Sequence, residues 1–125
     1  MRHDLRKAER LPLAGMAELV SGELRLAGNI IDISPKGIGL AVHRDDVQHL
    51  TPRLTWLCRV VAADLPAPVE FLVRAVRRKE RGFGVEVGCA ITVIDVKPLG
   101  LINAFRALYK ARAASFRSAP LQSPA

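Results

Sequence analysis

The chain has 125 residues, of which 50% are hydrophobic and 25% are charged, and this composition is typical of one compact domain. That length excludes a large multidomain enzyme, and apolar runs this short exclude a membrane span, so we expect a cytoplasmic protein. The formal net charge is +7, from 19 basic and 12 acidic residues.

The basic residues gather in three clusters. Residues 2–10 hold four of them, residues 74–81 hold five against Glu80 alone, and the segment after Asp95 holds five and no acidic residue. Such clusters favour an anionic partner, which from composition is a nucleotide, a nucleic acid or an acidic protein surface.

A charged arm over residues 1–10 is followed by short apolar segments, which recur about every ten residues between Gly, Pro, Asp and Asn. Their alternation of apolar and polar residues predicts six strands, enough to close a small antiparallel β-barrel. Residues 79–82 are expected to form the hairpin connection between the last two strands. The expected strands are Met16–Val20, Leu24–Ile33, Ile38–Val42, Leu54–Ala62, Val69–Arg78 and Phe83–Ile94.

The two cysteines, Cys58 and Cys89, lie in these apolar segments and form no Cys-x-x-Cys pair. This placement indicates buried thiols rather than a disulfide framework or a zinc site. Trp56 and Cys58 alternate on one face of a strand, so we expect both in the core.

From Pro98 the period changes to that of an amphipathic helix. The simplest explanation of its apolar stripe is packing on one end of the barrel, while the basic stripe is expected to be solvated. We therefore assign the domain to residues 11–116 and expect a disordered tail, rich in Pro and Ser, over residues 117–125. The apolar stripe comprises Leu101, Ile102, Phe105, Leu108, Tyr109 and Phe116, and the basic stripe Arg106, Lys110 and Arg117.

The segment Asp32-Ile33-Ser34-Pro35-Lys36-Gly37 lies between the second and third expected strands. In an extended segment Asp32 and Ser34 project to one face, and Ile33 points into the core. Pro35 favours a turn, and Gly37 can adopt a positive φ and lets another group approach the backbone closely. One interpretation is a polar strand end whose side chains cap backbone amides; the other is a binding site.

Upstream, Arg6 and Arg10 are four residues apart at the junction between the arm and the first strand, and 21 residues separate Arg10 from Asp32. The spacing alone is weak evidence in so arginine-rich a chain. The position of the pair carries more weight, because a mobile arm there can fold over the barrel.

With both motifs in this order, the sequence resembles the PilZ domain family, whose members carry Arg-x-x-x-Arg before the first strand and Asp/Asn-x-Ser-x-x-Gly on the barrel. Gly84-Val85-Glu86-Val87 is similar to the family's Gly-Val-Arg-Phe-like strand but departs from it at Glu86 and Val87. The resemblance covers about residues 5–110. It implies a mainly β fold, a six-stranded antiparallel β-barrel with a C-terminal amphipathic α-helix, that binds cyclic di-GMP.

The ligand-binding residues that the resemblance implies also suit the chemistry of this ligand. The arginine fork engages guanine edges or phosphate oxygens, Asp32 accepts guanine N–H groups, and Ser34 offers a hydroxyl. The expected site is Arg6, Arg10, Asp32, Ser34 and Gly37, with Leu5 and Lys7 as auxiliary positions.

A switch rather than a reaction follows from this arrangement. Without ligand Arg6 and Arg10 repel each other, and with ligand the arm is ordered over the barrel and presents a new surface to an unidentified downstream protein. The resemblance also links an arginine just before the first arginine of the motif to a stacked pair of ligands. Here that residue is Leu5, which favours one ligand per chain, although Lys7 adds a cation nearby.

No motif indicates an enzyme. The three histidines have no spacing that suits a metal or a nucleophile, and the glycines form neither a P-loop nor a dinucleotide fingerprint, so we expect no catalytic residue, metal or cofactor. One alternative is a PilZ-like protein-interaction module without nucleotide binding, which the retained motif residues oppose. Another is a basic barrel that binds single-stranded nucleic acid, which the scarcity of aromatic residues outside core-like positions opposes.

Overall fold

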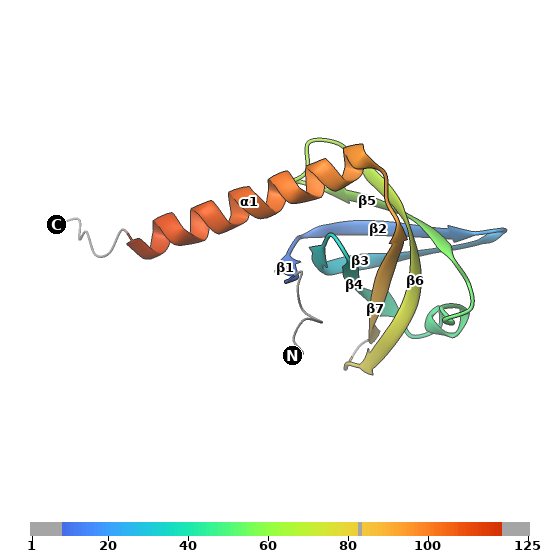
Figure 1. The fold of residues 1–125 in the computed structure, drawn as a ribbon. Helices are drawn as coiled ribbons and strands as arrows, with labels where there is room; N and C mark the ends of the chain where they lie inside the picture. Colours follow the sequence, from blue (N-terminus) through green and yellow to red (C-terminus); the bar gives the residue numbers. More distant parts are fainter. Residues whose placement is uncertain (1–8, 83, 119–125) are drawn as a thin grey trace, which may run out of the picture.

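The computed structural model describes residues 9–82 and 84–118, and in it the chain forms a small barrel with one long helix (Figure 1). The strands are β1 Leu11–Pro12, β2 Gly15–Ser21, β3 Leu24–Ser34, β4 Gly37–His43, β5 Trp56–Ala62, β6 Val69–Glu80 and β7 Gly84–Val93. A short 3₁₀ helix, η2, spans Val47–His49, and the helix α1 spans Val96–Ser118.

Antiparallel pairing closes the barrel. The strands follow one another in the order β3-β2-β5-β6-β7-β4, and β4 pairs with β3 again, which gives a closed ring of six strands. Every expected strand corresponds to one of these six, so the expected β-barrel is confirmed. The two-residue strand β1 was not expected; it extends the sheet by pairing Leu11 with Ile33 on β3.

The core is built by the alternation that the sequence predicted. On β6, Val69, Phe71, Val73 and Ala75 are all buried, and their neighbours face outward. Trp56, Cys58 and Cys89 are fully buried, as expected, and both cysteines are free thiols. Burial of this apolar set, at about 25 cal/mol per Å², is the main source of stability for the barrel.

A β-bulge in β3 changes which side chains face the core. Up to Ile30 the even-numbered residues of β3 point inward, but the register with β4 shifts between Ile30 and Asp32. Because a strand has a period of two, one extra residue reverses the two faces. Ile33 therefore becomes fully buried, as expected, and the carboxylate of Asp32 is turned toward the outside.

A bulge in β6 likewise reverses the inward and outward faces of that strand. The register with β7 shifts between Ala75 and Arg77, so Val76 is the extra residue. Ala75 is buried before the bulge, and Arg77 is exposed after it. Without this bulge the odd-numbered Arg77 would continue the inward-facing series of β6.

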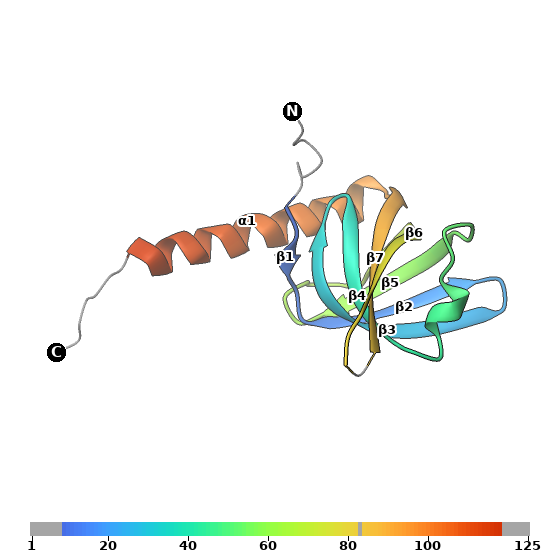
Figure 2. The same ribbon diagram turned by 90° about the horizontal axis from the view of Figure 1, so that it is seen from below.

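The helix α1 packs on the barrel with its first half only. Ile102 and Phe105 are buried against the core, and α1 contacts β3 and β6. Beyond them α1 runs past the barrel into open space (Figures 1 and 2), so Leu108 and Tyr109 are 51% and 36% exposed. The expectation that the whole apolar stripe packs on the barrel is therefore wrong for these two residues, because α1 is longer than the surface beneath it.

The described bounds of α1 differ slightly from those expected. It begins two residues before Pro98, which occupies the first turn, where the missing N–H of proline is tolerated. It continues to Ser118, two residues into the expected tail, and residues 119–125 lie outside the described residues. Within the described ranges, no helix has the length and apolar character needed to cross a membrane.

Candidate functional site

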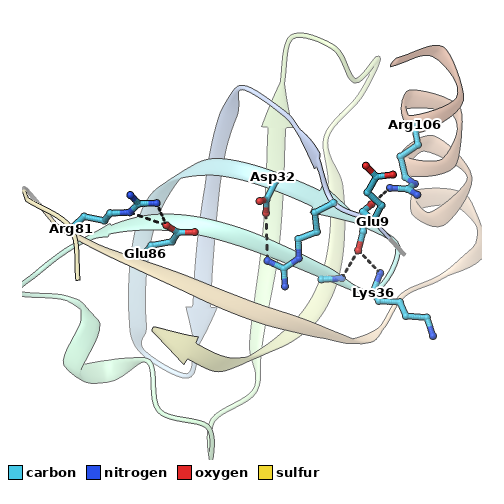
Figure 3. Close-up of polar contacts among 9 residues, drawn as sticks. Glu9, Asp32, Lys36, Arg81, Glu86 and Arg106 are labelled. Atoms are coloured by element: carbon cyan, nitrogen blue, oxygen red, sulfur yellow. Dashed lines mark hydrogen bonds and ion pairs between the residues drawn. The ribbon is translucent and has the colours of Figure 1, made fainter. Parts of the chain in front are cut away.

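Arg10 stands beside Asp32 on the outer surface of the barrel. Arg10 lies just before β1, and its Nη1 donates to Oδ1 of Asp32 over 3.4 Å, the contact drawn as a dashed line at Asp32 in Figure 3. Both side chains are 28% exposed. The pair is partly shielded yet open to a ligand, and the arm junction lies beside the strand motif at these two residues. Their role in ligand binding stays a prediction.

Beneath the guanidinium of Arg10 lies a surface without side chains, formed by Gly37 and Gly39 on β4 and Gly88 on β7. We call these residues the glycine floor. On β4, Gly39 is the register partner of Asp32 on β3 and of Gly88 on β7. Asp32, Gly39 and Gly88 therefore form one row across these three strands. A flat patch of this kind lets a large polar group lie against the backbone.

At Gly37 and Gly39 the floor leaves no space for a β-carbon, whereas a Cβ on Gly88 would make only ordinary contacts. A Cβ on Gly39 would lie 2.5 Å from Asp32 Oδ1, and a Cβ on Gly37 would lie 2.9 Å from Arg10 Nη2 and 3.0 Å from the carbonyl oxygen of Cys89. Within the described residues the only glycine with positive φ is Gly22, at 62°. Gly37 is therefore explained by close approach, one of the two roles expected for it, and not by its backbone conformation.

Ser34 builds the turn that leads into β4. Its Oγ accepts hydrogen bonds from the backbone N–H groups of Lys36 and Gly37, each over 3.1 Å, and the residue is 1% exposed. The carbonyl of Lys36 in turn accepts from the N–H of Ile91 over 2.9 Å, which ties the turn to β7. This is the capping interpretation of Ser34, and through it the hydroxyl fixes where Gly37 lies.

Below the glycine floor, burial and the charge of Arg10 both affect the pKa of the Cys89 thiol. Burial raises the pKa of Cys89 to about 11, and the nearby charge of Arg10 partly opposes that rise. Burial likewise raises the pKa of Cys58, and the charge of Cys89 raises it further. Both thiols stay protonated near neutral pH, so neither is a nucleophile here.

The helix α1 holds the chain immediately before Arg10. Arg106 donates to the backbone carbonyl of Glu9, as Figure 3 shows, and Lys110 Nζ lies 3.9 Å from the carboxylate of Glu9. These two members of the basic stripe were expected to be solvated, and Lys110 is exposed. Both also contact Glu9 at the arm junction, a contact that helical periodicity does not predict.

The described part of the site brings together Arg10, Asp32 and Gly37, with Ser34 one turn away. Arg6, Leu5 and Lys7 lie outside the described residues. Sequence reasoning missed Gly39 and Gly88. A signal was present, because both are glycines inside expected strands, and a glycine there often marks the approach of another group. Across residues 9–82 and 84–118, no cluster of His, Cys, Asp or Glu is suited to a metal ion.

The fold and this site define a small antiparallel β-barrel with an arginine-bearing segment laid across its outer surface. A family model described as PilZ domain matches residues 4–107. The chain therefore belongs to the PilZ domain family, whose members bind cyclic di-GMP as a ligand and act as receptor or adaptor modules. A search of curated proteins found no match.

Two solved structures support the assignment of the fold. The Bacillus subtilis inhibitor of motility (MotI/DgrA) matches with a TM-score of 0.70 and 11% identity, over 86% of this chain and 52% of that one. This chain thus spans about half the length of that protein. The PilZ domain of YcgR from Escherichia coli, solved with c-di-GMP, matches with a TM-score of 0.62 and 10% identity, over 85% of this chain and 96% of that one.

Proposed function

We propose that this chain is a receptor for cyclic di-GMP that acts without catalysis. The observation that carries the proposal is the placement of Arg10 against Asp32 above a floor kept free of side chains by three glycines. The similar PilZ domain of YcgR was solved with this ligand. A ligand with phosphates and guanines needs both a cation and a directional acceptor, and Arg10 and Asp32 supply them side by side.

Each site residue has a distinct role in this proposal. Arg6 and Arg10 clamp the ligand from the arm side through phosphate oxygens or guanine edges. Asp32 accepts guanine N–H groups and so selects guanine over adenine. Ser34 holds the turn, and Gly37 keeps the space in which the Arg10 guanidinium lies. A direct contact of the Ser34 hydroxyl with the ligand stays a prediction.

The proposed output is ordering of the arm. Its last residues are already attached to the barrel, because Arg106 and Lys110 hold Glu9 and Asp32 holds Arg10. A ligand that also engages Arg6 would fix residues 1–8 over the floor. The composite surface of arm, ligand and barrel is then what a downstream protein recognises.

Isothermal titration calorimetry with cyclic di-GMP tests the proposal. We expect saturable binding with about one ligand per chain, because Leu5 has no guanidinium to stack on a second base, and a shift toward two ligands in Leu5→Arg. Cyclic di-AMP, GMP and a homopolymer oligonucleotide serve as competitors and should bind more weakly. Chromatography after incubation should recover the ligand unchanged.

The same experiment separates the alternatives. Absence of binding by cyclic di-GMP would identify a protein-interaction module, and tighter binding of the oligonucleotide would identify a nucleic-acid-binding barrel; either result overturns the proposal. Hydrogen exchange measures the arm independently. Residues 1–10 should gain protection on addition of ligand, and unchanged exchange there would contradict arm ordering even if binding is observed.

A further inference from the structure

Two arginines of the cluster at residues 74–81 have no role in the site described so far. The other two arginines of the cluster are engaged: Arg81 Nε donates to Glu86 over 2.9 Å, and Arg78 donates to the carbonyl of Val47 over 3.4 Å. Arg74 and Arg77 are exposed and make no hydrogen bond or ion pair with any other described residue. Their charges are therefore uncompensated on the barrel surface.

The strand register places Arg77 at the edge of the glycine floor. Arg77 on β6 is the partner of Gly88, Gly88 is the partner of Gly39, and Gly39 is the partner of Asp32. Asp32 and Arg77 thus occupy the two ends of one row across four strands. With neighbouring strands about 4.8 Å apart, this row is about 14 Å wide, and its middle carries no side chains.

Arg77 lies on the same side of the sheet as Arg10. A Cβ built on Gly88 would lie 3.6 Å from the Cβ of Arg77 and 3.8 Å from both terminal nitrogens of Arg10. The two arginines therefore approach one glycine from the same face. Arg74 repeats this placement in the next row, because its partner Ala90 is also the partner of Gly37.

The bulge at Val76 turns the side chain of Arg77 to the outer face of the barrel. Two of the three register shifts in the described sheet come immediately before Asp32 and Arg77, the two ends of the row, and each turns the following side chain outward. The third shift, between Leu72 and Val73, lies outside the row. Bulges are often found beside binding sites, where they re-aim a side chain.

We propose that Arg77, assisted by Arg74, forms a second anion-binding edge of the floor and contacts the phosphodiester groups of the ligand. This proposal rests on the proposed function and extends it to β6. One edge offers a carboxylate acceptor suited to guanine, and the other offers guanidinium donors suited to phosphate. Three arginines around one carboxylate repel one another, and an anion above the floor relieves that repulsion.

Calorimetry on Arg77→Ala with cyclic di-GMP tests the proposal, with Arg53→Ala as a control of equal charge change. Arg53 lies in an exposed loop and has no ion pair with another described residue. We expect Arg77→Ala to weaken binding about tenfold or more, as for loss of a charge-assisted hydrogen bond, and Arg53→Ala to change it less than about twofold. Arg77→Gln, which preserves most of the side-chain length, should bind as weakly as Arg77→Ala.

The salt dependence distinguishes a phosphate contact from a structural effect. Removal of a phosphate contact makes the loss of affinity with rising salt shallower in Arg77→Ala than in the parent. Equal affinity of parent and Arg77→Ala, while Arg10→Ala is impaired, would overturn this inference and leave the proposed function standing. An unchanged salt dependence would overturn the phosphate assignment, and a parent that binds no cyclic di-GMP would overturn both proposals.

Discussion

The two outer faces of the barrel handle charge in opposite ways. On the face of β2 and β5, which we call the β2–β5 face, Arg25 pairs with Glu18 over 3.0 Å and Arg59 pairs with Glu70 over 3.5 Å. On the face of the glycine floor, Arg10 pairs with Asp32, but Arg74 and Arg77 form no ion pair with another described residue. The positive charge is therefore distributed unevenly between the two faces.

The faces also differ in what covers the backbone. Apolar side chains cover the β2–β5 face, where Met16 and Val61 are opposite each other and about half exposed. Glycines form the other face. A sheet surface free of side chains has no packing value of its own, so its presence beside Arg74 and Arg77 supports the proposal that this face binds a ligand.

The largest expected effect is that of Arg10→Ala. It removes at least two charge-assisted contacts, each contributing about 1.5–3 kcal/mol, so affinity for cyclic di-GMP should fall about 100-fold or more in calorimetry. The matched change on the β2–β5 face, Arg59→Ala, should leave affinity within about twofold. Arg10→Lys should recover only part of the loss, since lysine lacks the planar fork. Equal losses for Arg10→Ala and Arg59→Ala would contradict the distinction between the faces.

The next largest effects are expected for Gly39→Ala, on affinity, and Gly15→Ala, on stability. The Cβ of Gly39→Ala would displace the flexible carboxylate of Asp32, so ligand affinity should fall about tenfold while the melting temperature changes little. The Cβ of Gly15→Ala on β2 would lie 2.5 Å from the carbonyl oxygen of Val61, which the backbone cannot easily yield. This variant should lose about 1–3 kcal/mol of stability in urea titration and keep its affinity.

The contrast between lost affinity in Gly39→Ala and lost stability in Gly15→Ala tests whether the glycine floor serves binding. If Gly39→Ala lost stability as Gly15→Ala does, the floor would be a packing feature of the barrel. Gly100→Ala is a further control, since nothing lies within 4 Å of the added carbon on α1. It should bind normally and stabilise the helix slightly.

Asp32→Ala should act on selectivity more than on attraction. Loss of the acceptor for guanine N–H groups should bring the affinities for cyclic di-GMP and cyclic di-AMP closer together, by about tenfold. Competition titrations with both dinucleotides measure this ratio. Equal weakening toward both would show that Asp32 acts only by holding Arg10.

The smallest effect concerns pH and the two thiols. Because burial raises the pKa of Cys89 to about 11, the folded chain keeps this proton while the unfolded chain loses it near pH 9. The free energy of unfolding should therefore be unaffected by the thiols below about pH 9 and should fall as the pH rises toward 11. Urea titrations at pH 8 and pH 10 should show a flatter decline in Cys58→Ala and Cys89→Ala. An identical decline in the parent would contradict the assignment.

Much of the barrel was predictable because alternation is a local signal. The buried series on β6 and the two buried thiols could be placed from the sequence alone. The bulges could not, although the run Ile30-Ile31 before Asp32 breaks the alternation in the same way as an extra residue does. The register that aligns Asp32 with Arg77 depends on pairing between distant strands, and no local pattern encodes it.

The site was predictable only in part for the same reason. Arg10, Asp32 and Gly37 were found through their motifs and lie together in the structure, while their binding role stays a prediction. Gly39 and Gly88 become meaningful only when β4 and β7 are paired. The contact of Arg106 with Glu9 joins residues 97 positions apart, and amphipathic periodicity gives no information on such a contact.

The contacts of Arg106 and Lys110 with Glu9 join the arm junction to a helix that extends beyond the barrel. Twelve residues of α1 follow Arg106 and run beyond the barrel, which at 1.5 Å per residue is a rigid rod of about 18 Å. Rotating α1 by about 10° at this contact would carry its far end about 3 Å. A small rotation at the arm junction, which leaves the barrel unchanged, thus moves the exposed end of α1 by a larger distance.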